Sequence, residues 1–480
     1  MEHGPAIVWF RNDLRLLDNP AFTAAVAKGY SILPLFIWAP DEENGWPPGG
    51  ASKWWLHHSL KALSKMLGEL GLPLIIRVGK SLDVLEGLVK DVRAQAVFWN
   101  RRYEPWAIKR DAQIKTQLTN DGCLVQSFNG SLLVEPWNIL NSQGKPFQVF
   151  TAFWKSLQKQ YVHTPPLPIP SSFSPIKASI RSVSLDHLHL LPEVNWYGQI
   201  EALWTPGEVQ AGNLLDDFIE NHVTSYQVQR DFPGINGVSH LSPYLHFGEI
   251  SAKTIWHKVK EVHSQHEEEV GPYIRQLGWR EFANYLLYHF PQTVDKPLRT
   301  EFSRFPWWEN QEALKAWHKG KTGFPIVDAG MRELWSTGWM HNRVRMIVGS
   351  FLVKDLLVSW QYGARWFWDT LLDADMANNT LGWQWISGCG ADAAPYFRIF
   401  NPVTQGQKFD ADGVYVRRWI PELASLPNEY LHCPWEAPEQ VLRSSGVQLG
   451  TTYPNPIVDH SEARNRALLA FREVRSDREQ

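Results

Sequence analysis

Ala6-Ile-Val-Trp-Phe10 is the first of several short apolar stretches near the start of the chain, and it decides the fold class. Two segments with helical spacing, residues 52–70 and 108–118, lie between such stretches. Alternation of buried strands with helices is typical of a parallel sheet covered by crossover helices. The sequence therefore predicts an α/β domain with a doubly wound parallel sheet over residues 1–130, its strands at 6–10, 32–38, 74–78, 96–99 and 124–128.

Two further regions follow this domain. Residues 131–203 contain the proline-rich run Thr164-Pro-Pro-Leu-Pro-Ile-Pro170 and little periodicity, which is typical of an interdomain linker. Residues 204–480 carry long helical patterns without a strand series, so they are predicted to form an all-helical domain. The clearest of its predicted helices cover residues 213–222, 251–263, 273–289, 326–335 and 343–360.

The composition excludes several classes of protein. With 44% hydrophobic and 20% charged residues the chain is globular, and a net charge of −3 disfavours a general coater of polyanions. The three cysteines form no C-x-x-C pair, so neither a disulfide framework nor a metal site is predicted. The chain shows neither a secretory leader nor an apolar run of about 18 residues. We expect a cytoplasmic monomer with no membrane association and no obligate protein partner.

The 25 tryptophans exceed what an ordinary aromatic core requires, and several of them lie close to charged groups. The densest example is Trp339-Met-His-Asn-Arg-Val-Arg-Met346, followed by Asp373-Ala-Asp375 and Trp383-Gln-Trp385. Arginine binds phosphate, carboxylates bind sugar hydroxyls, and tryptophan stacks on flat rings. This combination suits a buried dinucleotide beside a nucleic-acid base.

Helical spacing sorts these side chains into faces. Gln276, Trp279 and Arg280 share one face, and so do Asn342, Arg345 and Met346, whereas Arg343 points elsewhere. Trp383 and Trp385 point about 200° apart, so they serve different neighbours. Taken singly, each pattern also fits a solvated polar face or a packed core.

A loop rich in hydroxyl groups precedes another predicted helix. Ser239 and Ser242 flank Leu241, and Ser242-Pro243 is typical of a helix start. Free N–H groups at a helix start attract anions, although an ordinary capped helix has the same sequence features.

Together these motifs resemble the DNA photolyase/cryptochrome family over nearly the whole chain. The similarity begins at Val8-Trp-Phe-Arg-Asn-Asp-Leu-Arg15 and is densest from Lys321-Thr-Gly-Phe-Pro-Ile-Val-Asp328 to Asp410. The runs at 340–346 and 367–375 are similar to bacterial photolyases of class I and class III that repair cyclobutane pyrimidine dimers (CPDs). The resemblance implies light-dependent repair of UV-damaged DNA, in which excited reduced FAD passes an electron to a flipped-out dimer.

The same resemblance assigns roles to individual residues. It implies FAD binding by Tyr226, Ser239, Leu241, Ser242, Tyr273, Arg280, Asn342, Arg345, Asp373, Asp375 and Asn379. It implies contacts to damaged DNA by Arg230, Gln276, Trp279, Asn342, Arg343, Met346 and Trp385. Gln276, Asn342 and Asn379 are the predicted catalytic residues, Asn379 facing the flavin N5 atom, and Trp383, Trp360 and Trp307 form the predicted electron-transfer chain.

Two positions depart from the pattern of CPD enzymes. Gln276 stands where these enzymes usually have glutamate, and an amide cannot give a proton to the lesion. Photolyases for (6-4) lesions carry glutamine there, but they also need histidines where this chain has Asn342 and Met346. Val238 replaces a common hydroxyl residue near the cofactor.

Two alternatives to CPD repair stay open, a (6-4) photolyase and a cryptochrome-type photoreceptor. Asn379, rather than the aspartate of plant cryptochromes, and the short tail after about residue 470 favour repair. A second, antenna chromophore is expected in the α/β domain or at its interface. The expected chromophore is either 5,10-methenyltetrahydrofolate or 8-hydroxy-5-deazaflavin. Trp106 and Ala107 do not match the polar pair of known folate-binding members, and Asp295 stands where a basic residue would help, so the choice between the two stays open.

Overall fold

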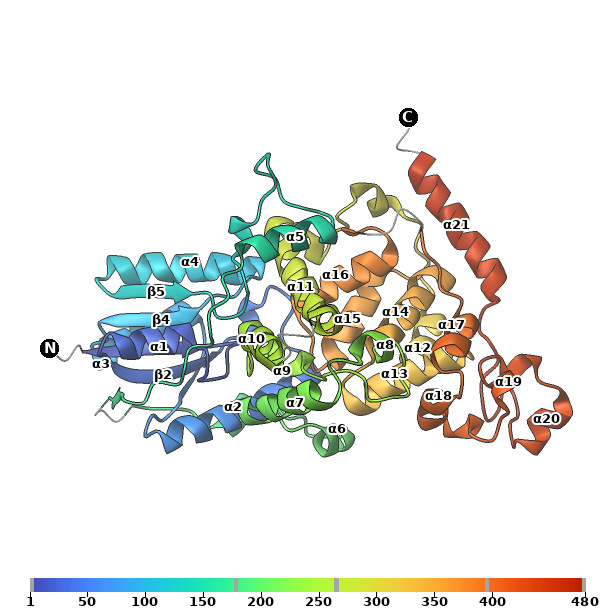
Figure 1. Ribbon diagram of the computed structural model, residues 1–480, viewed down its shortest axis with the longest axis horizontal. Coiled ribbons are helices and arrows are strands. Elements are labelled where there is room, and N and C mark those ends of the chain that lie inside the picture. Colours follow the sequence, from blue (N-terminus) through green and yellow to red (C-terminus); the bar gives the residue numbers. More distant parts are fainter. Residues whose placement is uncertain (1–3, 177–179, 263–266, 393–396, 477–480) are drawn as a thin grey trace.

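The computed structural model describes residues 4–176, 180–262, 267–392 and 397–476. It confirms the predicted fold class, with a parallel sheet at one end of the molecule and a helical mass at the other (Figure 1). The strands are β1 (Pro5–Phe10), β2 (Ser31–Trp38), β3 (Ile75–Val78), β4 (Ala96–Asn100), β5 (Leu124–Phe128) and the two-residue β6 (Ser174–Pro175). The helices around the sheet are α1 (Pro20–Ala27), α2 (Gly50–Glu69), α3 (Ser81–Val92) and α4 (Pro105–Asn120).

The strand order is β3-β2-β1-β4-β5, and every described pairing is parallel. β1 and β4, neighbours in the sheet, have entirely buried strand cores, which explains why each is a continuous apolar run. The chain runs from β1 through β2 to β3 on one side and then returns to place β4 on the other side of β1. The carboxyl ends of β1 and β4 therefore bound the crevice where such sheets commonly bind ligands. Helices α1 and α3 were not predicted from the sequence.

The helical part contains α7 (Glu208–Asn221), α8 (Tyr226–Gln229), α9 (Ser242–His246), α10 (Ala252–Val262), α11 (Glu267–His289), α12 (Gln311–His318), α13 (Pro325–Thr337), α14 (Asn342–Ser350), α15 (Trp360–Thr370), α16 (Met376–Ser387), α17 (Pro402–Phe409), α18 (Val414–Trp419), α19 (Asn428–Leu431), α20 (Glu439–Ser444) and α21 (His460–Ser476). Long α11 packs closely against α16, α8, α10 and α5 and so lies at the centre of the helical part. In the described ranges, none of the helices combines the length and the apolar character that crossing a membrane requires.

The predicted linker is more ordered than its composition suggests. It contains α5 (Phe150–Gln160) and α6 (Gly198–Leu203). Phe150, Phe153 and Trp154 of α5 are buried and contribute rings to the same core as α11. The composition gives no sign of α5, because the proline-rich run that dominates it begins only after α5 ends. The boundaries at 130/131 and 203/204 stay predictions.

The single helix predicted over residues 343–360 is wrong. α14 passes into a π-helical turn (Phe351–Asp355), where the helix ends, and a new helix, α15, begins at Trp360. Buried Leu357 takes a left-handed conformation with φ 52°, which ends the helix. Residues 347–360 are all buried, so hydrophobic periodicity gives no sign of the break within them.

Buried Arg15 joins the α/β part to the helical part. Its Nη1 donates to the carbonyl oxygen of Gly248 at 2.8 Å, and its Nη2 donates to the carbonyl oxygens of Asp18 and Gly130 at 2.7 and 2.5 Å. Glu208 of α7 accepts from the backbone N–H groups that follow Arg15, at 2.7 and 2.8 Å. The interface is therefore held by a guanidinium whose partners are fixed backbone atoms.

Glu249 lies buried in this interface, where its carboxyl group accepts from Trp55 Nε1 at 3.0 Å. Burial raises the pKa of Glu249 to about 8. A carboxyl group whose pKa is raised by folding stabilises the fold while it is protonated, and that contribution is lost as the pH rises through the folded-state pKa.

We therefore expect Glu249→Gln to reduce the loss of thermal stability at alkaline pH. The amide keeps an acceptor for Trp55 but never ionises, so the variant should match the wild type near pH 5 and unfold about 1–3 °C higher near pH 9. Thermal unfolding followed by circular dichroism at both pH values checks this. An equal shift at the two pH values would contradict the assignment of the titration to Glu249.

Candidate functional site

The first turn of α14 carries Arg345, which pairs with a second predicted site residue, Asp373. His341 caps the helix by accepting from the N–H of Arg343 at 3.2 Å. Arg345 makes two hydrogen bonds to the carboxylate of Asp373, at 3.1 and 2.8 Å, and its Nε donates to the carbonyl oxygen of Met340 at 2.7 Å. The predicted arginine and aspartate thus form one bidentate pair, although 28 positions separate them in sequence.

Asp375 holds the start of the neighbouring helix α16. Its carboxylate accepts from the N–H of Asn378 at 2.8 Å, and its Oδ2 lies 3.9 Å from His246 Nδ1 of α9. Burial alone raises the pKa of Asp375, but His246 and Arg280 favour the carboxylate, so the net pKa lies below the usual value. Asp375 and Arg280 also line one small crevice. The structure therefore brings α9, α11 and α16 together around charged groups.

The hydroxyl loop before α9 faces the same region. Trp339 Nε1 donates to Ser242 Oγ at 3.3 Å, which ties the loop to the residues preceding α14. Ser239 lies beside the buried hydroxyl of Tyr273, and the rings of Tyr273 and Tyr226 meet edge to face at 5.3 Å. Leu241 is buried beneath the loop. These predicted cofactor residues form one cluster.

Asn379 lies on the half-buried face of α16. Its side-chain amide donates to the carbonyl oxygen of Ala364 at 3.1 Å, which fixes the orientation of the amide. Its carbonyl oxygen is left as the acceptor that an adjoining ligand would meet.

The predicted DNA-contacting residues fall into two groups. Arg230, Gln276 and Trp279 line a cavity of about 1160 Å³ bounded by α5, α8, α10 and α11. Gln276 Nε2 donates to the carbonyl oxygen of Pro272 at 3.0 Å, so the amide is held against its own helix. Trp279 stacks on Phe150 with ring centroids 3.7 Å apart, which covers one face of its indole ring. Only the other face is left for a further ring.

Arg343, Asn342 and Met346 make up the second group, on α14. Amide and guanidinium nitrogens of Asn342 and Arg343 each lie 4.0 Å from the sulfur of Met346. Arg343 also pairs with Asp231 at 2.8 Å, a residue that the sequence analysis did not single out. Half-buried Trp385 is the remaining member of the predicted set, on α16.

Trp383 and Trp385 differ in burial as their spacing predicts. Trp383 is buried, and its ring meets Phe367 at 5.0 Å and Trp317 at 6.3 Å. A β-carbon at Gly363 would lie 2.1 Å from the indole of Trp383, so only glycine leaves room for the ring.

Trp360 and half-buried Trp307 belong to the same hydrophobic cluster as Trp383. Trp317 was missed by the sequence analysis, because it lies in an ordinary amphipathic helix, α12. From Trp317 a series of rings reaches exposed Trp335 through His318 and Trp366, with centroid distances of 5.5, 3.9 and 6.0 Å. The order of the predicted electron-transfer chain stays a prediction.

Comparisons with known proteins agree with this arrangement. Two family models match, DNA photolyase over residues 6–171 and the FAD binding domain of DNA photolyase over residues 273–473. A deoxyribodipyrimidine photo-lyase of Agrobacterium fabrum is 46% identical over 99% of this chain and 99% of its own length. Cryptochrome-2 of Arabidopsis thaliana is 43% identical over 98% of this chain and 79% of its own length. The crystal structure of a class III photolyase from Agrobacterium tumefaciens superimposes with a TM-score of 0.95 at 46% identity, covering 99% of this chain and 98% of that one.

The chain belongs to the DNA photolyase family. The predicted family membership is thereby confirmed, and its helical part matches an FAD-binding domain.

The residues of this photolyase-family site fit a dinucleotide such as FAD. Arg280 and Arg345 can meet charged groups, the carboxylates of Asp373 and Asp375 can accept hydroxyl groups, and the nearby Nε2 of His341 is buried without a hydrogen-bond partner among the described residues. Burial lowers the pKa of His341 to about 4, so its imidazole is neutral at pH 7. In the described ranges, no group of three His, Cys, Asp or Glu side chains could hold a metal ion.

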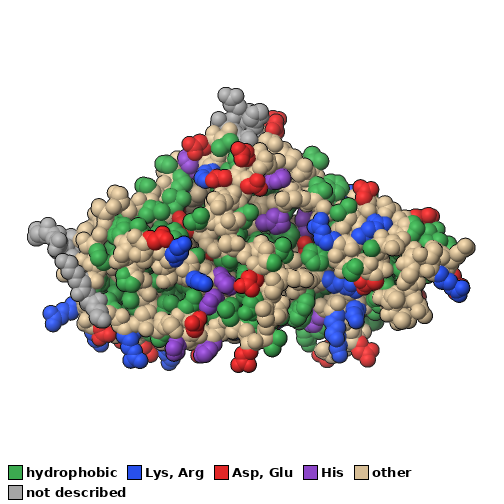
Figure 2. All heavy atoms as spheres, turned by 90° about the horizontal axis from the view of Figure 1, so that it is seen from below, with side chains coloured by type: hydrophobic (Ala, Val, Ile, Leu, Met, Phe, Trp, Pro, Cys, Tyr) green, Lys and Arg blue, Asp and Glu red, His purple; other side chains and the backbone are tan. Residues whose placement is uncertain are grey.

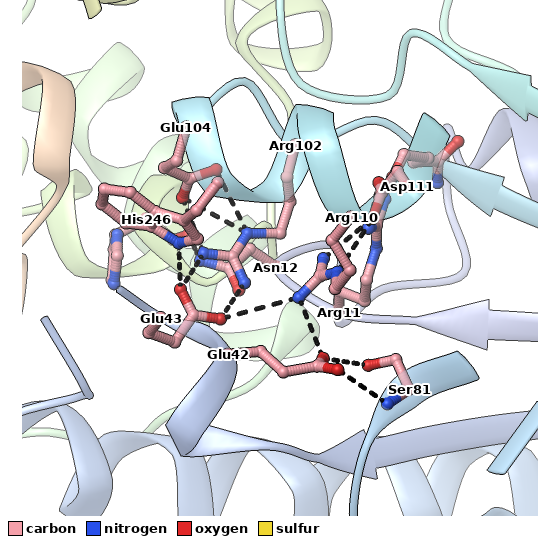
Figure 3. A network of polar contacts seen from close by, with 12 residues as sticks. Arg11, Asn12, Glu42, Glu43, Ser81, Arg102, Glu104, Arg110, Asp111 and His246 are labelled. Carbon is pink, nitrogen blue, oxygen red and sulfur yellow. Dashed lines mark hydrogen bonds and ion pairs between the residues drawn. The ribbon is translucent and has the colours of Figure 1, made fainter. Parts of the chain in front are cut away.

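A charged network fills the crevice at the carboxyl ends of β1 and β4 (Figure 3). Arg102 pairs with Glu43 at 2.7 Å and with Glu104 at 2.9 Å, and Arg110 pairs with Asp111 at 2.9 Å. Burial acts to raise the pKa of Glu43, but Arg102, Trp106 and Arg110 together outweigh it, so the pKa lies below the usual value and the carboxylate is favoured. The adjoining cavity is only about 90 Å³, so side chains occupy most of this crevice.

We expect Trp383→Phe to abolish light-driven reduction of oxidised FAD, because Trp383 is the buried ring from which the aromatic contacts extend outward. Repair by chemically reduced enzyme should be largely unchanged. Absorbance at the oxidised flavin band, followed under blue light with an external reductant, checks this. Trp137→Phe, at a half-exposed ring elsewhere, is the matched control, and normal photoreduction in Trp383→Phe would refute the assignment.

Proposed function

We propose that this protein is a deoxyribodipyrimidine photo-lyase that splits cyclobutane pyrimidine dimers in UV-damaged DNA under blue light. The main support is one observation: the Arg345–Asp373 pair lies beside half-buried Trp339, which bonds to Ser242 of the hydroxyl loop, and Asp375 lies beside His246 of the helix that follows this loop. The identity to a named photo-lyase over 99% of both chains supports the same activity. We further propose that it acts as a monomer on cytoplasmic, nucleoid-associated DNA.

In this proposal FAD is held by the cluster around α9, α11, α14 and α16. When bound and reduced, FAD supplies the excited electron that opens the dimer ring. The protein orients the cofactor and the dimer and excludes water from the site. Arg280 and Arg345 hold anionic groups, Asp373 and Asp375 accept hydroxyl groups, and the fixed amide of Asn379 presents an acceptor without a titratable proton.

The DNA lesion enters from the side of Gln276, Trp279 and Asn342 in this proposal. Flipping a damaged pair costs a few kcal/mol, and stacking on tryptophan offsets roughly 1–3 kcal/mol per base. Since Phe150 covers one face of Trp279, the ring can stack on one base only, and Trp385 is the second candidate platform. Arg230 and Arg343 supply phosphate contacts, which carry no sequence information.

This division of labour is testable with two variants. Arg343→Ala should weaken binding to damaged and intact duplex alike and reduce the slope of log affinity against log salt by about one. Trp279→Ala should lower affinity for the damaged duplex selectively. Fluorescence anisotropy at several salt concentrations measures both, and the same pattern of loss in both variants would contradict the proposal.

We also propose that an antenna chromophore, a folate or an 8-hydroxy-5-deazaflavin, binds at the Trp154 and Trp256 wall of the cavity of about 1160 Å³ and leaves the Gln276 and Trp279 wall to the lesion, rather than binding in the charged crevice of the α/β domain. Its walls include Trp154 and Trp256, 5.8 Å apart, and Tyr161, 5.0 Å from Trp256. The Nε1 of Trp256 is buried with no hydrogen-bond partner among the described residues. Aromatic walls with a free donor suit a planar chromophore with carbonyl groups.

Trp256→Leu should therefore lose the near-UV absorbance of a co-purified chromophore and keep that of FAD. Trp137→Leu should keep both. Absorption spectra of the native proteins and mass spectrometry of the released chromophore check this. Retention of a full complement of chromophore in Trp256→Leu would place the antenna elsewhere.

The decisive experiment for the activity uses two duplexes, one with a single cyclobutane dimer and one with a single (6-4) lesion. Reduced enzyme and blue light should restore thymines in the first duplex only, as seen by chromatography of the digested strand. Restoration in the second duplex alone would make the protein a (6-4) photolyase. No restoration in either, with FAD bound and reduced, would favour the photoreceptor alternative.

A further inference from the structure

We propose that Asp231 is a built-in competitor of DNA phosphate, which limits the affinity of the enzyme for DNA and hastens release of the repaired duplex. This inference rests on the proposed function, in which Arg343 and Arg230 contact DNA phosphates.

Asp231 lies directly after α8, between the two arginines. Its Oδ1 is 2.8 Å from Nη2 of Arg343 and 3.9 Å from Nε of Arg230. The exposed fractions are 34% for the Asp231 side chain and 18% for that of Arg343, so an anion from solvent can reach this ion pair. One carboxylate therefore occupies both cations that would face the DNA backbone.

The guanidinium of Arg343 cannot simply turn away from Asp231. Its central carbon lies 4.4 Å above the ring of Phe409, which is buried at the end of α17. Its Nε is buried without a hydrogen-bond partner among the described residues. The ring of Phe232 meets that of Phe409 edge to face, with centroids 6.2 Å apart. The planar group is thus held flat, and its terminal nitrogens are the atoms for which anions compete.

Arg230 is restrained in a similar way. Its guanidinium lies 5.4 Å from the centre of the Tyr226 ring, at the start of the same short helix. α8, α14 and α17 lie together in the helical half of the molecule (Figure 1). On the face drawn in Figure 2, basic and acidic side chains lie among one another, in keeping with the net charge of −3.

A phosphate that binds Arg343 must either displace Asp231 or lie beside a carboxylate of the same sign. In the first case Asp231 is released to solvent and takes up a cation, which cancels part of the counterion release that drives binding to DNA. In the second case the two anions repel each other. Either way the carboxylate lowers affinity through the backbone contacts, which are the same in damaged, repaired and intact DNA.

The test is Asp231→Asn, which keeps the size of the side chain and removes its charge. A partly exposed ion pair of this kind predicts binding about two- to fivefold tighter, for damaged and intact duplex alike. The slope of log affinity against log salt should steepen by up to about one. Dissociation of repaired duplex should slow by a similar factor, with the single-turnover repair rate unchanged.

Two further variants make the result specific. Glu422→Gln removes the same charge from a similarly exposed pair, Glu422 with Arg332 at 2.7 Å, and gives the general effect of net charge. Arg343→Met shows whether Arg343 binds DNA at all, and adding Asp231→Asn to it should give a smaller gain than in the wild type.

The outcomes separate the two levels of the argument. If Arg343→Met binds DNA as tightly as the wild type, the phosphate contact in the proposed function is wrong. If Arg343→Met binds weakly but Asp231→Asn equals Glu422→Gln, the competition is refuted and the phosphate contact stands. Weaker binding by Asp231→Asn would show that the carboxylate positions Arg343 for DNA, which also overturns the competition.

Discussion

The buried guanidinium of Arg15 is the contact on which the arrangement of the two halves depends. It donates to carbonyl oxygens before α1, after β5 and after α9, and a buried arginine that lost these acceptors would be strongly destabilising. Gly248, which supplies one of the acceptors, approaches the backbone of Asn12 so closely that a β-carbon there would lie 2.1 Å from its carbonyl oxygen. The sheet and helix α9 are therefore positioned through backbone atoms, which sequence changes at the surface leave in place.

The sequence predicts most of the architecture, because in most elements the pattern of apolar residues matches the pattern of burial. All five principal strands were predicted to within a residue; β1, β2 and β4 are almost entirely buried apolar runs, whereas β3 and β5, at the ends of the strand order, are buried only in part. Helix α1 was missed because it is short and mostly apolar, without the stripe that marks an amphipathic helix. The break before Trp360 was missed for the related reason that it lies within a continuously buried run, residues 347–360.

The candidate site shows the limit of prediction by family motif. Motif matching selects residues that a ligand would touch, and Arg345 does pair with Asp373, while Asp375 lies beside His246 of α9. It does not select residues that act on them. Asp231, Phe150 and Trp317 matter through contacts with Arg343, Trp279 and Trp383, and nothing in their local sequence distinguishes them from ordinary surface or core positions.

The position of the Trp383 ring depends on neighbouring glycines, which have no β-carbon. Gly363 faces the indole at a distance that no β-carbon could share, and a β-carbon at Gly349 would lie 3.6 Å from the same ring. A genome that encoded alanine at position 363 would differ by one methyl group and would keep every aromatic residue of the family pattern. The change from glycine to alanine would look conservative in the sequence, yet the new methyl group would displace the indole ring of Trp383. Surveys of natural variation in this family therefore need to weigh such glycines as heavily as the tryptophans beside them.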